Sequence, residues 1–90
     1  EASEMAISET EGLETVTSPL VGVFYEAPGQ GEAPFVRVGD RVKKGQTIGI
    51  IEAMKLMNEI PATCDGVVES ILVKNEQTVE YGQPLVQIRP

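Results

Sequence analysis

The chain has 90 residues and carries 7 basic and 14 acidic side chains, a formal charge of −7 at pH 7. This excess of carboxylates argues against nucleic acid or an anionic membrane surface as the main partner. Cys64 is the single cysteine and there is no histidine, so neither an internal disulfide nor a transition-metal site is expected. No apolar run approaches the roughly 20 residues that cross a bilayer. We expect one small domain with an aliphatic core.

Residues 1–16 are acidic and short of large apolar side chains. They contain five glutamates and no lysine or arginine. Such a composition buries too little apolar surface to offset the conformational entropy of folding. We therefore expect a flexible acidic tail or linker end over 1–16 and a folded domain over 17–90.

From residue 17 onward, short β-branched runs alternate with turn-forming Gly, Pro, Asn and Asp. The runs are PLVGVF, FVRV, QTIGII, GVVESILV and PLVQI. This pattern predicts an all-β domain.

An internal repeat organises these runs. Residues 39–52 align with 76–89 at an offset of 37, which places Gly45 on Gly82. Each half is too small to bury its own apolar face, so the two halves must pack on each other. We expect a flattened barrel or sandwich with approximate two-fold symmetry.

The first half contains an insertion. Gly22 aligns with Gly66 at an offset of 44, seven more than the offset found downstream. The extra residues fall in YEAPGQGEAPF, residues 25–35, which has no counterpart in the second half. A loop or short hairpin is expected to protrude there.

The segment EAMKLMNEI, residues 52–60, lies between the two halves and contains Lys55. Its residues favour a helix, but an isolated helix of about 8 residues is marginal. We expect residues 48–52 to pair with 58–62 as a hairpin that reverses at Lys55. A two-residue turn favours Asn-Gly, because φ is positive there. Met54 and Lys55 break this rule, which is expected where function selects the residues.

The motif Glu52-Ala53-Met54-Lys55-Leu56-Met57 resembles the attachment site of biotinyl domains in the biotin/lipoyl attachment family. There a lysine between hydrophobic neighbours is biotinylated at an exposed hairpin. The resemblance extends from about residue 18 to 88. It implies a hammerhead fold of two antiparallel four-stranded sheets with quasi-two-fold symmetry. It also implies covalent biotin on Lys55, with Met54, Leu56 and Met57 as its neighbours.

The insertion, at about residues 26–34, resembles the thumb of biotinyl domains from bacterial-type, multi-subunit acetyl-CoA carboxylases. That resemblance implies that Ala27, Pro28 and Gly29 contact the biotin ring, although short Pro/Gly insertions are usually plain surface loops. Glu52 and Glu59 flank the lysine. The resemblance implies recognition by biotin protein ligase, and a solvated pair of like charges is the alternative.

The resemblance implies a non-catalytic carrier component and not an enzyme. The resemblance implies that biotin on Lys55 is carboxylated by a biotin carboxylase subunit with ATP and bicarbonate. Carboxyltransferase subunits then pass the carboxyl group to acetyl-CoA, giving malonyl-CoA for fatty acid synthesis. A monomeric domain without nucleic-acid or membrane partners is expected, in the cytoplasm or in a plastid stroma.

Three other functions stay open at this point. A biotin carrier for another acyl-CoA or oxo-acid carboxylase or decarboxylase would use the same motif. A lipoyl carrier shares the fold, but its lysine typically follows Asp, whereas Met54 precedes Lys55 here. An interaction module without cofactor would leave Lys55 unmodified.

Overall fold

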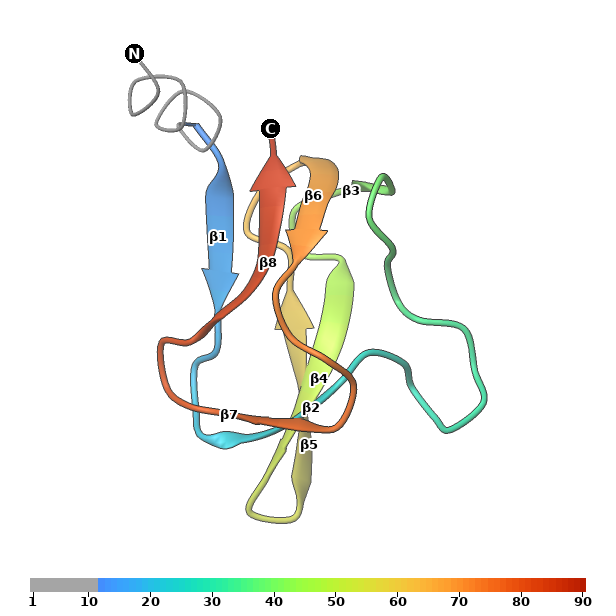
Figure 1. The fold of residues 1–90 in the computed structure, drawn as a ribbon, viewed down its shortest axis with the longest axis vertical. Coiled ribbons are helices and arrows are strands. Elements are labelled where there is room, and N and C mark those ends of the chain that lie inside the picture. Colours follow the sequence, from blue (N-terminus) through green and yellow to red (C-terminus); the bar gives the residue numbers. More distant parts are fainter. Residues whose placement is uncertain (1–11) are drawn as a thin grey trace.

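The computed structural model describes residues 12–90, which form strands and connecting loops without a helix (Figure 1). The strands pair into two antiparallel four-stranded sheets, with the orders β1-β8-β6-β3 and β5-β4-β2-β7. The expected all-β architecture is therefore confirmed. The strands are β1 (Glu14–Thr17), β2 (Gly22–Tyr25), β3 (Arg41–Val42), β4 (Thr47–Ala53), β5 (Leu56–Pro61), β6 (Gly66–Ile71), β7 (Gln77–Val79) and β8 (Pro84–Arg89).

The core lies between the two sheets and is almost entirely aliphatic, as the composition predicts. Ile51 from one sheet and Ile88 from the other are both 0% exposed. Burial of one such side chain stabilises the fold by roughly 1.5–3 kcal/mol. The buried cluster comprises Val16, Phe24, Val36, Val42, Ile48, Ile51, Ile60, Ala62, Val68, Val73, Val79, Leu85, Val86 and Ile88.

The repeat seen in the sequence is a repeat of structure. Strands β1, β8, β6 and β3 occupy the same places in their sheet as β5, β4, β2 and β7 occupy in the other. Hydrogen bonds repeat as well. The Lys43 N–H donates to Gln46 Oε1 at 3.1 Å, and 37 residues later the Glu80 N–H donates to Gln83 Oε1 at 3.0 Å. The expected quasi-two-fold relation of the halves is therefore confirmed.

A matched pair of glycines allows two strands in each half to approach closely. A Cβ atom on Gly22 would lie 2.4 Å from the carbonyl oxygen of Glu52, and one on Gly66 would lie 2.4 Å from that of Arg89. No side chain fits at either position. These glycines are required by backbone packing inside strands, whereas Gly45 and Gly82, at φ 91° and 81°, are required by turns.

The folded domain begins earlier than residue 17. Strand β1 starts at Glu14 and pairs with β8, and its Val16 is only 2% exposed. The expected tail is therefore wrong for residues 14–16, because β1 supplies the outer strand of its sheet as β5 does in the other half. Of the rest of the expected tail, Gly12 and Leu13 belong to no strand, and residues 1–11 lie outside the described residues.

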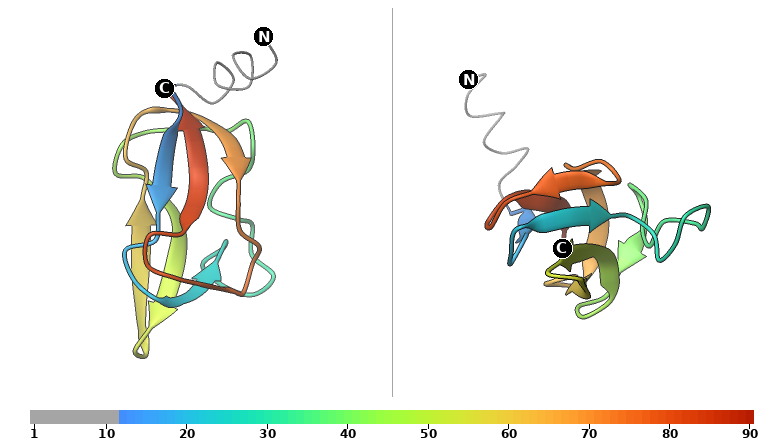
Figure 2. Two further views of the ribbon diagram at one scale, coloured as in Figure 1. Left: turned by 60° about the vertical axis from the view of Figure 1, so that its left-hand side comes forward. Right: turned by 90° about the horizontal axis from the view of Figure 1, so that it is seen from below.

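The insertion is a loop that leaves β2 and projects away from the sheets before the chain returns at β3 (Figure 2). Within residues 12–90 no helix has the length and hydropathy of a membrane span. That part of the chain also contains no group of three or more His, Cys, Asp or Glu side chains arranged to hold a metal ion.

Gly22→Ala should lower the free energy of unfolding by about 1–3 kcal/mol, because the new Cβ forces β2 away from the rigid backbone of β4. Gly29→Ala is the matched control. Its Cβ would meet only the flexible end of the Glu32 side chain, at 2.8 Å, so a change within about 0.5 kcal/mol is expected. Urea unfolding measures both, and equal stabilities would contradict the role given to Gly22.

Candidate functional site

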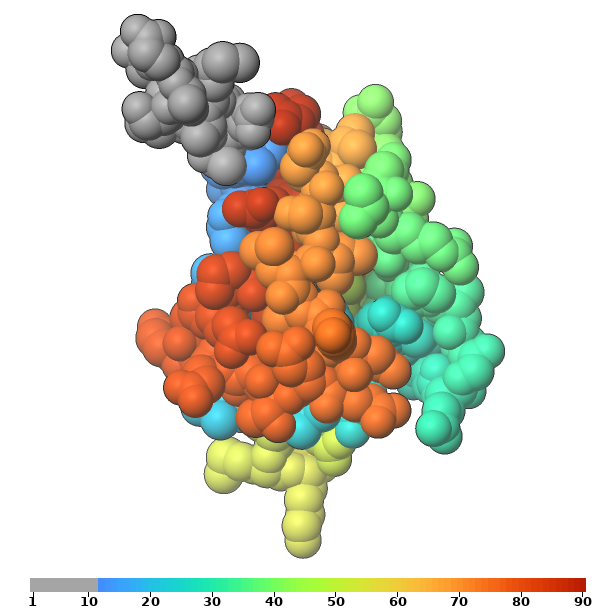
Figure 3. Space-filling model, in the orientation of Figure 1, coloured from blue at the N-terminus to red at the C-terminus, as the bar shows by residue number. Residues whose placement is uncertain are grey.

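The hairpin predicted around Lys55 is present. Strands β4 and β5 pair from Thr47 with Pro61 out to Ala53 with Leu56. The expected hairpin is therefore confirmed, but its register differs by one residue from the expected pairing of 48–52 with 58–62, because Glu52 pairs with Met57 and Ala62 lies beyond the end of β5. Only Met54 and Lys55 remain for the turn, and the space-filling view shows this tip projecting below the rest of the domain (Figure 3).

Both residues of the turn have a left-handed backbone. Met54 has φ 53° and Lys55 has φ 66°. Positive φ at both central residues is the requirement of a type I′ hairpin, which glycine and asparagine meet without strain. The left-handed conformation costs a residue with a Cβ roughly 1–2 kcal/mol. The turn therefore keeps Met54 and Lys55 at a cost in stability, as expected for a functional tip.

The side chains around Lys55 are apolar and exposed. Met54 is 93% exposed, Leu56 65% and Met57 55%, and Lys55 itself is exposed. None of the three apolar side chains belongs to the buried core. Large apolar side chains clustered in solvent are typical of contact surfaces.

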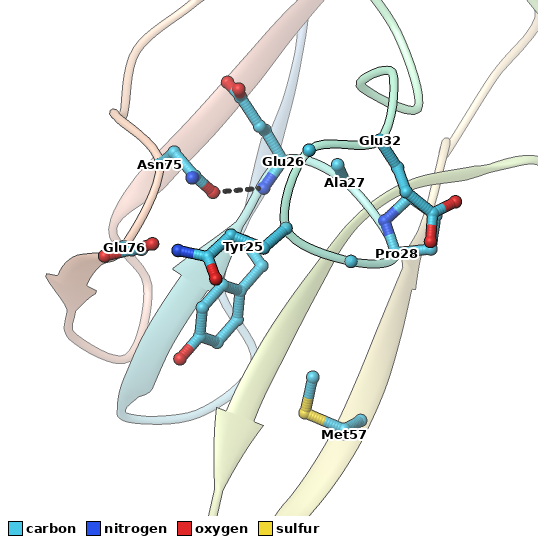
Figure 4. A pocket seen from close by; sticks show the side chains of 11 residues that line it. Tyr25, Glu26, Ala27, Pro28, Glu32, Met57, Asn75 and Glu76 are labelled. Carbon is cyan, nitrogen blue, oxygen red and sulfur yellow. Dashed lines mark hydrogen bonds between the residues drawn. The ribbon is translucent and has the colours of Figure 1, made fainter.

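A cavity of about 390 Å³ lies between the hairpin, the inserted loop and the residues that precede β7 (Figure 4). It lies within the 300–1,000 Å³ range of small-molecule sites. The cavity brings Met57 of the hairpin together with the three loop residues singled out from the sequence. Its lining is Tyr25, Glu26, Ala27, Pro28, Gly29, Gln30, Gly31, Glu32, Met57, Asn75 and Glu76.

Backbone hydrogen bonds hold the inserted loop in place beside this cavity. The Phe35 N–H donates to the Glu26 carbonyl at 2.8 Å, which closes the neck of the loop. The Glu26 N–H donates to Asn75 Oδ1 at 3.0 Å and so ties the loop to the second half of the repeat. The loop wall is therefore anchored at both of its ends.

The two glutamates expected to flank the lysine have partners within the chain. The Tyr25 hydroxyl donates to Glu52 Oε1 at 3.0 Å, and this hydrogen bond raises the pKa of the Tyr25 phenol above its ordinary value. The Thr47 hydroxyl donates to Glu59 Oε1 at 3.3 Å. Tyr25 lines the cavity, so its hydrogen bond places the Glu52 carboxylate near the cavity. Glu59 is instead hydrogen-bonded to Thr47, at the end of the hairpin away from the turn.

Sequence reasoning missed three residues that line the cavity. Tyr25 is the first residue of the inserted segment and has no signal of its own, and Asn75 looks like an ordinary turn residue. Glu76 carried a signal, since it occupies the repeat position of Gly39. Both adopt positive φ, 67° for Glu76 and 96° for Gly39. A glutamate kept where the fold prefers glycine indicates a role for its side chain.

The chain was compared with known proteins. Residues 14–88 match the biotin/lipoyl family, described as biotin-requiring enzyme. The chain belongs to this family. It is 62% identical over 78 residues to a biotin carboxyl carrier protein of acetyl-CoA carboxylase from Nostoc sp. (strain PCC 7120 / SAG 25.82 / UTEX 2576), covering 87% of this chain and 43% of that protein.

Two further matches extend this placement in the biotin/lipoyl family. A biotin carboxyl carrier protein of acetyl-CoA carboxylase from Streptococcus pyogenes serotype M6 is 64% identical over 74 residues, covering 82% of this chain and 45% of that protein. The solved urea carboxylase of Kluyveromyces lactis matches with a TM-score of 0.72 and 37% identity, over 84% of this chain and 6% of that one. The chain thus spans less than half the length of these relatives.

Replacing Met54 and Lys55 with Asn and Gly should raise the free energy of unfolding by about 1–2 kcal/mol, because it removes left-handed strain from the turn. Met54→Ala is the control, since it removes the exposed side chain but keeps a Cβ at positive φ. Denaturant unfolding of both variants measures the difference. An equal gain in Met54→Ala would assign the effect to side-chain exposure instead.

Proposed function

We propose that the chain is the biotin-carrying domain of a biotin carboxyl carrier subunit of acetyl-CoA carboxylase, with biotin attached to Lys55. One observation carries the proposal: a lysine is held at the exposed tip of a hairpin by a turn that glycine would form with less strain. The names of the two bacterial relatives, which are more than 60% identical to the chain, support the choice of carboxylase.

The residues present fit a covalent biotin. The Lys55 amine is solvent-exposed at the tip, where it can attack an activated carboxyl group. Met57 follows Lys55 by two residues, so their Cα atoms lie at most about 7 Å apart, and Met57 lines the cavity. The lysine stem and the valeryl chain of biotin together exceed that separation. The ring can therefore reach the cavity beside Ala27, Pro28 and Gly29.

Attached biotin supplies the group chemistry, since a nitrogen of its ureido ring accepts a carboxyl group derived from bicarbonate, with ATP consumed, and yields it to acetyl-CoA. The chain itself is a non-catalytic carrier. Its hairpin presents Lys55 away from the sheets, and its short turn limits the directions the tether can take. Holding the ring within reach of each active site raises its effective concentration there.

The proposal assigns the partners of this tip. Biotin protein ligase would form the amide on Lys55, with Glu52 and Glu59 among the residues it recognises. A biotin carboxylase subunit and the carboxyltransferase subunits would then receive the tethered ring. The domain would act as a monomer within that complex. The relatives supporting this proposal include bacterial and chloroplastic proteins, so we propose the cytoplasm or a plastid stroma as its compartment.

The second candidate is a biotin carrier for another carboxylase. The matches to a urea carboxylase, at 37% identity, and to a long-chain acyl-CoA carboxylase, at 25% with a TM-score of 0.73, favour it. The acetyl-CoA carboxylase carriers are much closer in sequence, at 62% and 64% identity. A lipoyl carrier is disfavoured, because Met54 precedes Lys55 where that subfamily typically has Asp.

Lys55→Arg should keep the fold but abolish biotin acceptance, because arginine retains the charge and lacks the nucleophilic amine. Intact mass and peptide mapping, after incubation with biotin protein ligase, biotin and ATP, measure this. Lys44→Arg is the matched control. Its mass should increase by that of one biotin less one water, with the modification at Lys55. A mass gain in the Lys55→Arg variant would contradict the site assignment.

Deleting residues 27–33, which matches the length of the second half of the repeat, should leave a folded domain that still accepts biotin. Turnover of the reconstituted carboxylase should fall, because one wall of the cavity is lost. A second readout is the change in the Asn75 amide shift on biotinylation, which the deletion should remove. Unchanged turnover and a persisting shift would make the insertion a plain surface loop.

A further inference from the structure

The end of the sheet that carries Lys55 also carries two exposed apolar side chains far from it in sequence. Val21 is 60% exposed and Tyr81 is 77% exposed. Val21 directly precedes β2, whose residue Val23 pairs with Glu52, so Val21 lies near the end of β4 that leads into the turn. Tyr81 follows β7, which pairs with β2 on its other side. The connections that hold both residues lie at the end of the domain from which the tip of the hairpin projects (Figure 1).

The two loops that hold these residues are joined by their backbones. The Gly82 N–H donates to the Ser18 carbonyl at 2.7 Å, and the Ser18 N–H donates to the Gln83 carbonyl at 2.9 Å. Val21 and Tyr81 are therefore presented by one hydrogen-bonded unit and not by independent loops.

The internal repeat tests whether the fold needs apolar residues at these two positions. In the other half, Asp65 occupies the place of Val21 and Lys44 occupies the place of Tyr81. There the Lys44 N–H donates to Asp65 Oδ1 at 2.7 Å. The same turn architecture thus forms with charged, well-solvated side chains. Fold requirements do not account for Val21 and Tyr81.

We propose that Val21 and Tyr81, together with the exposed Met54 and Leu56, form the docking surface for the ligase that acylates Lys55. The inference rests on the proposed biotin-carrier function. A free lysine stem is short, so its amine enters a ligase active site only when the end of the domain touches the ligase. A biotinylated arm is longer, so later partners can reach the ring without such close contact with the end of the domain. The ligase is therefore the occupant that this surface fits.

The chemistry of the surface defines its partner. Tyr81 and Val21 present apolar area, and tyrosine is enriched among residues that dominate binding energy. Glu80 directly precedes Tyr81 in the chain, and Glu52 pairs with Val23, two residues after Val21, so both carboxylates belong to the same end of this sheet. The ligase should therefore present an apolar patch bordered by basic side chains.

The test exchanges residues between the two halves. Val21→Asp with Tyr81→Lys installs the pair that the opposite turn already carries, and it leaves the net charge unchanged. We expect KM for the domain to rise about tenfold in biotin transfer by the ligase, with kcat within about twofold, since docking precedes chemistry. Mass spectrometry of the product gives both constants.

The reverse exchange, Lys44→Tyr with Asp65→Val, is the matched control at the opposite end and should leave KM unchanged. Tyr81→Ser provides a milder variant if the double exchange does not fold, and it should raise KM about threefold. An unchanged KM in the folded exchange variant would overturn the proposal. Normal biotinylation with impaired use by the biotin carboxylase subunit would overturn the choice of occupant. Failure of the wild-type chain to accept biotin would instead contradict the carrier function itself.

Discussion

Burial of the two apolar sheet faces against each other is the constraint on which this structure depends. Each half of the repeat contributes strands to both sheets, so neither half has a core without the other. The close approach of Gly22 to β4, and of Gly66 to β8, keeps the pairing tight. Packing of Ile51 and Ile88 then excludes water from the centre. The hairpin with Lys55 extends directly from β4 and β5, two strands of this packed unit.

That rigid base explains how an unfavourable turn is maintained. A two-residue turn with both φ values positive is imposed by the pairing of β4 with β5 up to Ala53 and Leu56. Met54 and Lys55 have no freedom to relax without breaking this register. The exposed apolar side chains at the tip add no core contact. Stability generated between the sheets therefore supports a strained, exposed tip.

The cavity and the proposed docking surface lie where the two halves of the repeat differ. The loop over 26–35 is present in one half only, and it forms a wall of the cavity. Glu76 replaces the glycine found at position 39, and it also lines the cavity. Val21 and Tyr81 occupy the positions that Asp65 and Lys44 occupy in the other half. Residues shared by both halves, such as Gln46 and Gln83, make equivalent structural hydrogen bonds instead.

A strand predicted at FVRV, residues 35–38, is absent from the structure, and the short strands β1, β3 and β7 lie outside the predicted runs. The sequence alone determined the other five strands, the repeat and the hairpin at Lys55. These features depend on local pattern, on glycine spacing and on a motif contiguous in the chain. It placed the start of the domain too late, because the only sign of β1 was one buried residue, Val16, in an acidic stretch.

Tertiary structure decided the rest. Asn75 and Met57 meet the inserted loop across the cavity, and Tyr25 meets Glu52 through a hydrogen bond. These contacts join residues far apart in sequence, and their geometry follows from strand register and sheet packing. No local pattern encodes such contacts, so they become visible only in the folded chain.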